Sequence, residues 1–117
     1  MSEVSIYHNP RCSKSRQTLQ LLEQRDIQPK VIDYLNNPLA ADELKDLLHK
    51  LGFISARELM RSKETIYKEM NLASVTDEEA LLDAMAAHPK LMERPVVVCN
   101  GRARLGRPPE AVLDILP

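Results

Sequence analysis

The segment that decides the fold reads Val4-Ser5-Ile6-Tyr7-His8-Asn9-Pro10-Arg11-Cys12-Ser13-Lys14-Ser15-Arg16. Its first four residues predict a short strand, and the following His-Asn-Pro predicts a turn. We expect a helix from about Ser13 to Arg25 and a second strand over Lys30-Val31-Ile32-Asp33-Tyr34, which Asn36-Asn37-Pro38 ends. A strand, a helix and a strand in this order predict a parallel pair joined by a right-handed crossover.

Helices dominate the middle of the chain. Asp42 is expected to cap a helix whose leucines recur at helical spacing and which Gly52 ends. Two further helices are expected from the capping-box sequences Ser55-Ala56-Arg57-Glu58 and Thr76-Asp77-Glu78-Glu79, and Pro89 must end the second.

A hairpin is predicted near the end of the sequence. Val96-Val97-Val98-Cys99 is followed by Asn100-Gly101 and then by Arg102 to Leu105. Such a pattern favours a type I′ turn, which needs positive φ at both central residues. Pro109 is expected to open a terminal helix. The order predicts an α/β fold: a thioredoxin-like four-stranded mixed sheet flanked by helices, with a helical insert between strands 2 and 3.

Composition excludes several classes of protein. The 117 residues suit a single domain over 1–117. An aromatic content of 3% and a net charge of −1 argue against nucleic-acid binding. No apolar run approaches the roughly 20 residues of a membrane span. No signal peptide is visible, and two cysteines are too few for a secreted disulfide framework. We therefore expect a cytoplasmic monomer with no metal and no membrane partner.

Positive charge is concentrated near the predicted hairpin. Four arginines and no acidic residue lie between Arg94 and Arg107, so the remainder of the chain carries −5. A local positive field in a mildly acidic protein suits a small anion, although composition alone favours an ordinary solvated surface.

Cys12 is the first candidate for chemistry. It lies in a polar loop, where we expect an exposed thiol, between a strand and the N-terminus of the following helix. Ligands of α/β sheets gather at such points. A helix N-terminus and nearby cations lower a thiol pKa below its free value of about 8.5. The cations expected to act here are Arg11, Lys14, Arg16 and, when protonated, His8. The alternative is an incidental surface cysteine.

No second thiol lies one helical turn after Cys12, because Ser15 stands where thioredoxin-type motifs have cysteine. If Cys12 performs redox chemistry, an external thiol must complete it. Cys99 ends an apolar run and is expected to be buried, although a Cys12–Cys99 disulfide stays open. A Cys-x5-Arg phosphatase is set aside, because the required arginine position holds Thr18.

Three stretches together resemble the glutaredoxin-linked arsenate reductase (ArsC) family: residues 7–16 (YHNPRCSKSR), 94–98 (RPVVV) and 104–110 (RLGRPPE). The resemblance extends over essentially the whole chain. It implies reduction of arsenate to arsenite, with glutathione as co-substrate, glutaredoxin as partner and no bound cofactor. It places the nucleophile on Cys12, the anion-binding arginines on Arg61, Arg94 and Arg107, and supporting roles on His8, Ser15 and Arg16.

By this resemblance, the thiolate attacks arsenic, glutathione attacks the adduct, and glutaredoxin releases arsenite. Guanidinium groups suit the oxyanion because they offer two parallel donors. Thioredoxin-like proteins place a cis proline beside the cysteine, so we expect a cis Arg94–Pro95 bond. Two alternatives stay open: a non-enzymatic regulator resembling redox-sensing RNA polymerase-binding proteins, and a relative acting on another oxyanion or on a glutathione adduct.

Overall fold

The structure is a computed structural model that describes residues 3–116, so residues 1–2 and 117 of the predicted domain lie outside the described residues. The chain divides into two compact units. The first combines the chain up to Asn37 with the segment from Arg94 onward, and the second is Pro38–Glu93. Within residues 3–116, no helix combines the length and the apolar character needed to cross a membrane.

The first unit contains a four-stranded mixed sheet, as predicted, in the order β2-β1-β3-β4. Its strands are β1 (Val4–Tyr7), β2 (Lys30–Ile32), β3 (Val96–Cys99) and β4 (Arg102–Leu105). β1 pairs in parallel with β2 and antiparallel with β3, and β3 pairs antiparallel with β4. The parallel pair is the one that the strand–helix–strand order requires.

The second strand is shorter than predicted, because β2 ends at Ile32 and a turn begins at Asp33. The Asp33 backbone oxygen accepts a hydrogen bond from the Asn37 N–H over 2.9 Å. The Asp33 carboxylate also accepts one from the Asn36 side-chain amide over 2.6 Å. Local side-chain hydrogen bonds of this kind compete with strand pairing.

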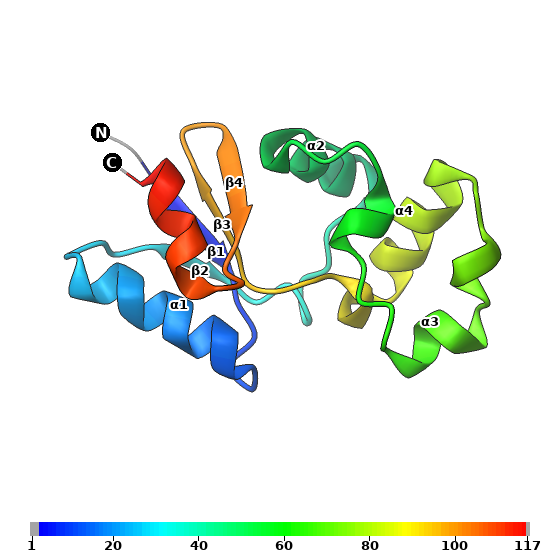
Figure 1. Cartoon of the computed structure of the whole chain (residues 1–117), viewed down its shortest axis with the longest axis horizontal. Helices are drawn as coiled ribbons and strands as arrows, with labels where there is room; N and C mark the ends of the chain where they lie inside the picture. Colours follow the sequence, from blue (N-terminus) through cyan, green and yellow to red (C-terminus); the bar gives the residue numbers. More distant parts are fainter. Residues whose placement is uncertain (1–2, 117) are drawn as a thin grey trace. The chain divides into compact units, whose positions relative to one another are not determined.

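One face of the sheet carries α1 (Ser13–Gln24) and the 3-10 helix η4 (Pro109–Ile115), which lie side by side (Figure 1). The residues buried between these elements are apolar and come from both ends of the sequence: Val4, Ile6, Leu22, Val97, Cys99, Val112 and Ile115. Their alternation along β1 and β3 follows the two-residue period of a strand. This packing places the first turn of α1 beside the end of β1.

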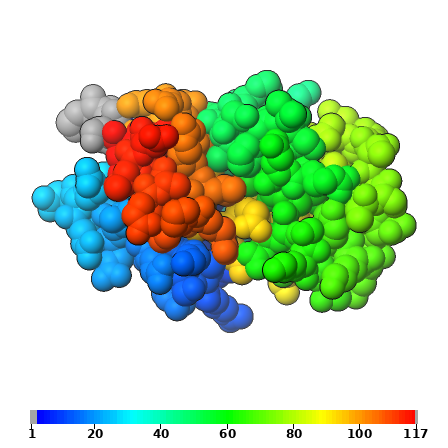
Figure 2. All heavy atoms as spheres, in the orientation of Figure 1, coloured from blue at the N-terminus to red at the C-terminus, as the bar shows by residue number. Residues whose placement is uncertain are grey.

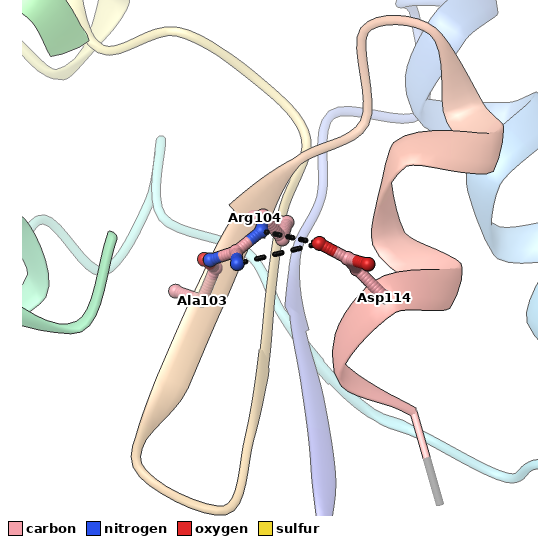
Figure 3. Close-up of polar contacts among 3 residues, drawn as sticks. All are labelled: Ala103, Arg104 and Asp114. Carbon is pink, nitrogen blue, oxygen red and sulfur yellow. Dashed lines mark hydrogen bonds and ion pairs between the residues drawn. The ribbon is translucent and has the colours of Figure 1, made fainter. Parts of the chain in front are cut away.

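The terminal helix is also tied to the sheet by an ion pair (Figure 3). The Arg104 Nη2 atom lies 3.4 Å from the Asp114 Oδ2 atom, which joins β4 to η4. Because the Asp114 side chain is largely exposed, a contribution of at most about 1 kcal/mol is expected.

The hairpin prediction is confirmed. Asn100 and Gly101 have φ values of 55° and 74°, the positive pair that a type I′ turn requires. The Arg94–Pro95 bond is cis, as expected, and the Arg107–Pro108 bond is cis as well.

The second unit is helical. It contains α2 (Ala41–Leu51), η1 (Ala56–Leu59), α3 (Thr65–Glu69), η2 (Leu72–Ser74), α4 (Glu78–Ala87) and η3 (Pro89–Leu91), in which η denotes a 3-10 helix. The periodic leucines of α2 are buried, and Gly52 ends that helix with a φ of 76°. The short helices α3, η2 and η3 were not predicted, because each has too few residues for a hydrophobic period to show.

Two of the predicted helix caps are wrong. α2 begins two residues earlier than expected, with Ala40 at the cap, and Asp42 lies inside the first turn. The Glu43 carboxylate accepts the Ala40 N–H over 2.9 Å. α4 is capped by Asp77 in place of Thr76, because the Asp77 carboxylate accepts the Glu79 N–H over 3.2 Å.

The capping box at Ser55 is confirmed. The Ser55 hydroxyl accepts the Arg57 N–H over 3.2 Å, and the Glu58 carboxylate accepts the Ser55 N–H over 3.1 Å. Glu78 of α4 adds a long-range contact, because its carboxylate accepts hydrogen bonds from the Ser55 hydroxyl and the Ala56 N–H. The helix η1 is thereby joined to α4.

Candidate functional site

Cys12 occupies the N-cap position of α1, with extended backbone angles. Its N–H donates to the Asn9 backbone oxygen over 3.0 Å, and its own backbone oxygen accepts the Arg16 N–H over 3.0 Å. The expectation of an exposed thiol is wrong, because Cys12 is only 8% exposed. Its immediate neighbours Arg11, Ser13 and Lys14 are exposed, while the cysteine itself is buried.

Two arginines from the other end of the sequence meet Cys12. The Arg107 Nη2 atom donates a hydrogen bond to the Cys12 Sγ atom over 3.6 Å. The Arg107 Nε–H donates to the Arg94 backbone oxygen over 2.8 Å. The Arg94 guanidinium also acts on the Cys12 thiol and lowers its pKa.

The sheet register explains why these residues meet. Val96 at the start of β3 pairs with Leu105 at the end of β4. The residues just before β3 and just after β4 therefore lie at the same end of the sheet's strands. Val96 also pairs with Tyr7, the last residue of β1. The loop that follows β1 and holds Cys12 therefore opens beside Arg94 and Arg107.

The pKa of the Cys12 thiol is lower than its ordinary value. Burial is the largest single influence and raises this pKa. The N–H groups of Ser15 and Lys14 at the start of α1, together with the Arg94 guanidinium, lower it by more. The helix N–H groups and the Arg94 guanidinium thus stabilise the thiolate, the form of cysteine that acts as a nucleophile.

The cations predicted from the loop are not those that act on the thiol. Lys14 lowers the pKa of Cys12 through its backbone N–H and not through its ammonium group. The Arg16 Nη1 atom donates to the Pro10 backbone oxygen over 2.9 Å, and Arg11 does not contribute to the shift. Side chains close in sequence point outward here, and the guanidinium groups that reach the sulfur come from distant segments.

His8 and Ser15 form a buried pair. The His8 Nδ1 atom lies 2.6 Å from the Ser15 Oγ atom, which also accepts the Asn9 N–H over 3.0 Å. Burial, followed by the charge of Arg16, lowers the pKa of His8, although Asp33 opposes this shift. This shift disfavours the protonated form in which His8 was expected to act on Cys12. A neutral ring can accept the Ser15 hydroxyl proton at Nδ1.

Arg61, the third predicted anion-binding arginine, belongs to the second unit. Its N–H donates to the Leu91 backbone oxygen over 2.7 Å, and its Nε atom lies 3.9 Å from the Glu64 Oε2 atom. The role of Arg61 at an anion stays a prediction.

Two of the three predicted anion-binding arginines have a buried N–H group that donates no hydrogen bond within the described part of the chain. The Nε atoms of Arg94 and Arg61 are buried and have no hydrogen-bond acceptor among the described residues. A buried donor without an acceptor costs about 1–3 kcal/mol, so native structures rarely retain one without a reason. For Arg94, which already contacts Cys12, binding of an oxyanion would supply that acceptor.

The resemblance placed Arg107 at the site, but sequence reasoning missed the role of Gly106 in the close packing that brings Arg107 to Cys12. A Cβ atom on Gly106 would lie 2.7 Å from the Pro95 Cγ atom and would also meet the buried Thr18 hydroxyl. Glycine at this position lets the end of β4 approach α1. The only signal in the sequence was a single glycine immediately before Arg107.

Cys99 is fully buried in the sheet, as expected. It pairs with Val4, at the opposite end of β1 from Tyr7. Val4 and Tyr7 are three strand positions apart, about 10 Å. Disulfide bonding requires Cα atoms within about 7 Å, so this fold keeps Cys99 away from Cys12. Both thiols are free. Among the described residues, no cluster of His, Cys, Asp or Glu has the arrangement of a metal site.

The chain is similar to known proteins over nearly its full length. The model of the ArsC family matches residues 7–115. An arsenate reductase of Neisseria meningitidis is 51% identical over 117 residues, which cover 99% of this chain and 100% of that protein. The uncharacterised protein YfgD of Escherichia coli K12 is 62% identical over 115 residues, 97% of each chain. The structure of an arsenate reductase from Vibrio cholerae superimposes with a TM-score of 0.95 at 58% identity and covers 97% of this chain and 98% of that one.

Proposed function

The chain belongs to the ArsC family, and from that membership we propose that it is an arsenate reductase that uses glutathione and glutaredoxin. The observation that carries the proposal is the hydrogen bond from Arg107 to the Cys12 sulfur, together with the half-buried Arg94, whose guanidinium lowers the thiol pKa. A thiolate and two guanidinium groups in one place combine a nucleophile with an oxyanion site. The related arsenate reductases supply the identity of the oxyanion.

Arsenate suits this arrangement by charge and shape. It is a tetrahedral anion whose oxygens accept the paired donors of guanidinium groups. Arg107 and the unused Nε–H of Arg94 supply such donors beside Cys12. The proposal adds Arg61 as a third arginine, whose Nε–H has no hydrogen-bond acceptor among the described residues.

The first step forms a covalent adduct. The Cys12 thiolate attacks arsenic, and one arsenic oxygen leaves as water after protonation. A sulfur–arsenic bond replaces an oxygen–arsenic bond, and arsenic remains As(V). The same Arg94 guanidinium that lowers the Cys12 pKa would hold the anion against the thiolate. Nucleophilic catalysis of this type divides one difficult reduction into easier steps.

The electrons must come from outside the chain. Position 15 is a serine that is hydrogen-bonded to His8, and Cys99 of β3 pairs with Val4, at the opposite end of β1 from the Cys12 loop. In the proposed sequence, the glutathione thiol replaces a second arsenic oxygen, which also leaves as water. The Cys12 sulfur and the glutathione sulfur are then both bound to arsenic.

Glutaredoxin completes the reduction. Its thiolate attacks the glutathione sulfur, and the electron pair of the broken sulfur–arsenic bond remains on arsenic, which becomes As(III). Water then displaces Cys12 and releases arsenite, and the thiolate is restored. Two thiols are oxidised to one disulfide for each arsenate reduced. A chain that depends on reduced thiols would work in the cytoplasm, where glutathione keeps them reduced, and we propose that it acts there as a monomer.

A coupled assay tests this function. Purified protein is supplied with arsenate, glutathione and glutaredoxin, and arsenite is quantified. We expect turnover that requires all three, and a loss of at least about 100-fold when Arg94 or Arg107 is replaced by Gln. Arg102→Gln is the matched control, because Arg102 is an exposed arginine at the turn of the same hairpin.

Other results would support the rival functions. Turnover with a different oxyanion, but none with arsenate, would keep the site and replace the substrate. Absence of turnover with every oxyanion, together with binding to RNA polymerase, would favour a regulator.

A further inference from the structure

Arg11, in the loop before Cys12, and Lys14, in the first turn of α1, are basic residues to which the proposed chemistry gives no task. Both side chains are exposed, and neither forms an ion pair with any residue in the described part of the chain. The Arg16 guanidinium, by contrast, donates a hydrogen bond to the Pro10 backbone oxygen. Two exposed cations without an ion-pair partner among the described residues therefore lie close to Cys12 in the sequence, in the N-terminal segment that Figure 2 draws in dark blue.

The charge around this loop is not balanced locally. No acidic residue occurs between Val4 and Leu22, while this stretch contains Arg11, Lys14 and Arg16. The first unit has nine basic and six acidic residues, a net charge of +3. The second has seven basic and eleven acidic residues, a net charge of −4. Positive charge is therefore concentrated on the unit that holds the thiol.

We propose that Arg11 and Lys14 dock the carboxylates of the small thiol that attacks the Cys12 adduct, a peptide thiol of the glutathione class. This inference rests on the proposed function, because it identifies what recruits the second substrate of the same site. The oxyanion itself does not need these cations, since Arg94 and Arg107 already contact the buried sulfur.

The positions of the two cations suit such a thiol. Arg11 precedes Cys12 and Lys14 follows it by two residues, so the cations lie on both sides of the reacting sulfur along the chain. An extended tripeptide spans about 10 Å, with its thiol in the middle and a carboxylate toward each end. A thiol with this charge pattern can place its sulfur at Cys12 while each carboxylate meets one cation.

The first measurement requires no arsenate. The Cys12 thiolate attacks oxidised glutathione, forms a mixed disulfide and releases one glutathione thiolate, and the rate is followed by mass spectrometry. The variants are Arg11→Glu, Lys14→Glu and the double variant. We expect the double variant to react about tenfold more slowly with oxidised glutathione. Its rate with uncharged hydroxyethyl disulfide should change less than about twofold, and Arg102→Glu should change neither rate.

The second measurement uses turnover. The double variant should show a raised KM for glutathione, with kcat at saturating glutathione and the protection of Cys12 by arsenate against iodoacetamide both unchanged. A salt titration adds a further readout, because screening should slow the wild-type reaction with oxidised glutathione and leave the variant nearly unaffected.

Three results would overturn the inference. Equal losses with the charged and the uncharged disulfide would show that the substitutions alter the thiol itself. Weaker arsenate protection would assign the cations to the oxyanion, and a raised KM for glutaredoxin alone would assign them to the protein donor. The two proposals can fail separately. If wild type reduces no arsenate but reacts faster with oxidised glutathione than the double variant does, the proposed function is wrong and the docking contact is supported.

Discussion

The Arg107 Nη2 atom lies 3.6 Å from the Cys12 Sγ atom, although the two residues are 95 positions apart in the chain. The contact exists because β1 pairs with β3, and β3 with β4. The end of the hairpin is thereby brought to the start of α1, and a guanidinium group from one end of the sequence reaches a thiol near the other end.

Replacement of Cys12 by serine should abolish arsenate reduction and leave the fold intact. A hydroxyl is a far weaker nucleophile at neutral pH, while serine has nearly the volume of cysteine and keeps the N-cap position favourable. Arsenite production should fall to the background rate, with an unfolding free energy within about 1 kcal/mol of wild type. Substantial turnover by the folded variant would disprove the nucleophile assignment.

Cys12 should titrate below the ordinary thiol pKa, and Arg94→Gln should raise the value, because Arg94 is one of the groups that lower it. The rate of iodoacetamide alkylation against pH measures this directly. Arg102→Gln is the control and should leave the titration unchanged. A wild-type midpoint near about 8.5 would remove the activation argument.

The same shift affects stability. Because the folded-state pKa of Cys12 is lowered, the folded protein releases the thiol proton at lower pH than the unfolded chain does. The stabilisation is complete above the unfolded-state pKa and is lost as pH falls through the folded-state pKa. Urea unfolding should show the difference between wild type and Cys12→Ser growing as pH rises toward about 8.5.

His8 should remain neutral at pH 7, because burial and the charge of Arg16 lower its pKa. Arg16→Gln should raise that pKa, whereas Arg11→Gln should not, as NMR titration of the ring can determine. In the unfolded chain, histidine titrates near about 6.5, so His8 stabilises the fold above that pH, and the contribution is lost as pH falls through the folded-state pKa. A His8 midpoint above 6.5 would contradict the assignment of a neutral ring.

Cys99→Ala should preserve turnover and reduce stability. Cys99 is fully buried in the sheet, and removal of its sulfur leaves a small cavity that costs about 1–2 kcal/mol. Urea unfolding measures the loss, and the coupled assay measures turnover. If a folded Cys99→Ala protein lost activity, a direct redox role for this thiol would have to replace the external-thiol scheme.

Local sequence determined most elements of the first unit. The alternation in Val4–Tyr7, the Asn100-Gly101 turn and the helical spacing after Ser13 act within a few residues, and each predicted the element that the structure contains. Predictions failed where neighbouring side chains compete for the same backbone group. Asp77 displaced Thr76 as the cap of α4 in this way.

The identity of the nucleophile and its N-cap position were also readable from the sequence, since both depend on the order of a strand, a turn and a helix. Its burial was not, and its cationic partners Arg94 and Arg107 were indicated only by the resemblance to the ArsC family and not by the local sequence. Arg11, Lys14 and Arg16 are its neighbours in sequence, but a helix N-terminus directs its backbone N–H groups toward the cap while its long side chains reach solvent. Arg94 and Arg107 reach the sulfur only because three strands pair in register and Gly106 lets β4 approach α1, relationships that arise only when the chain folds.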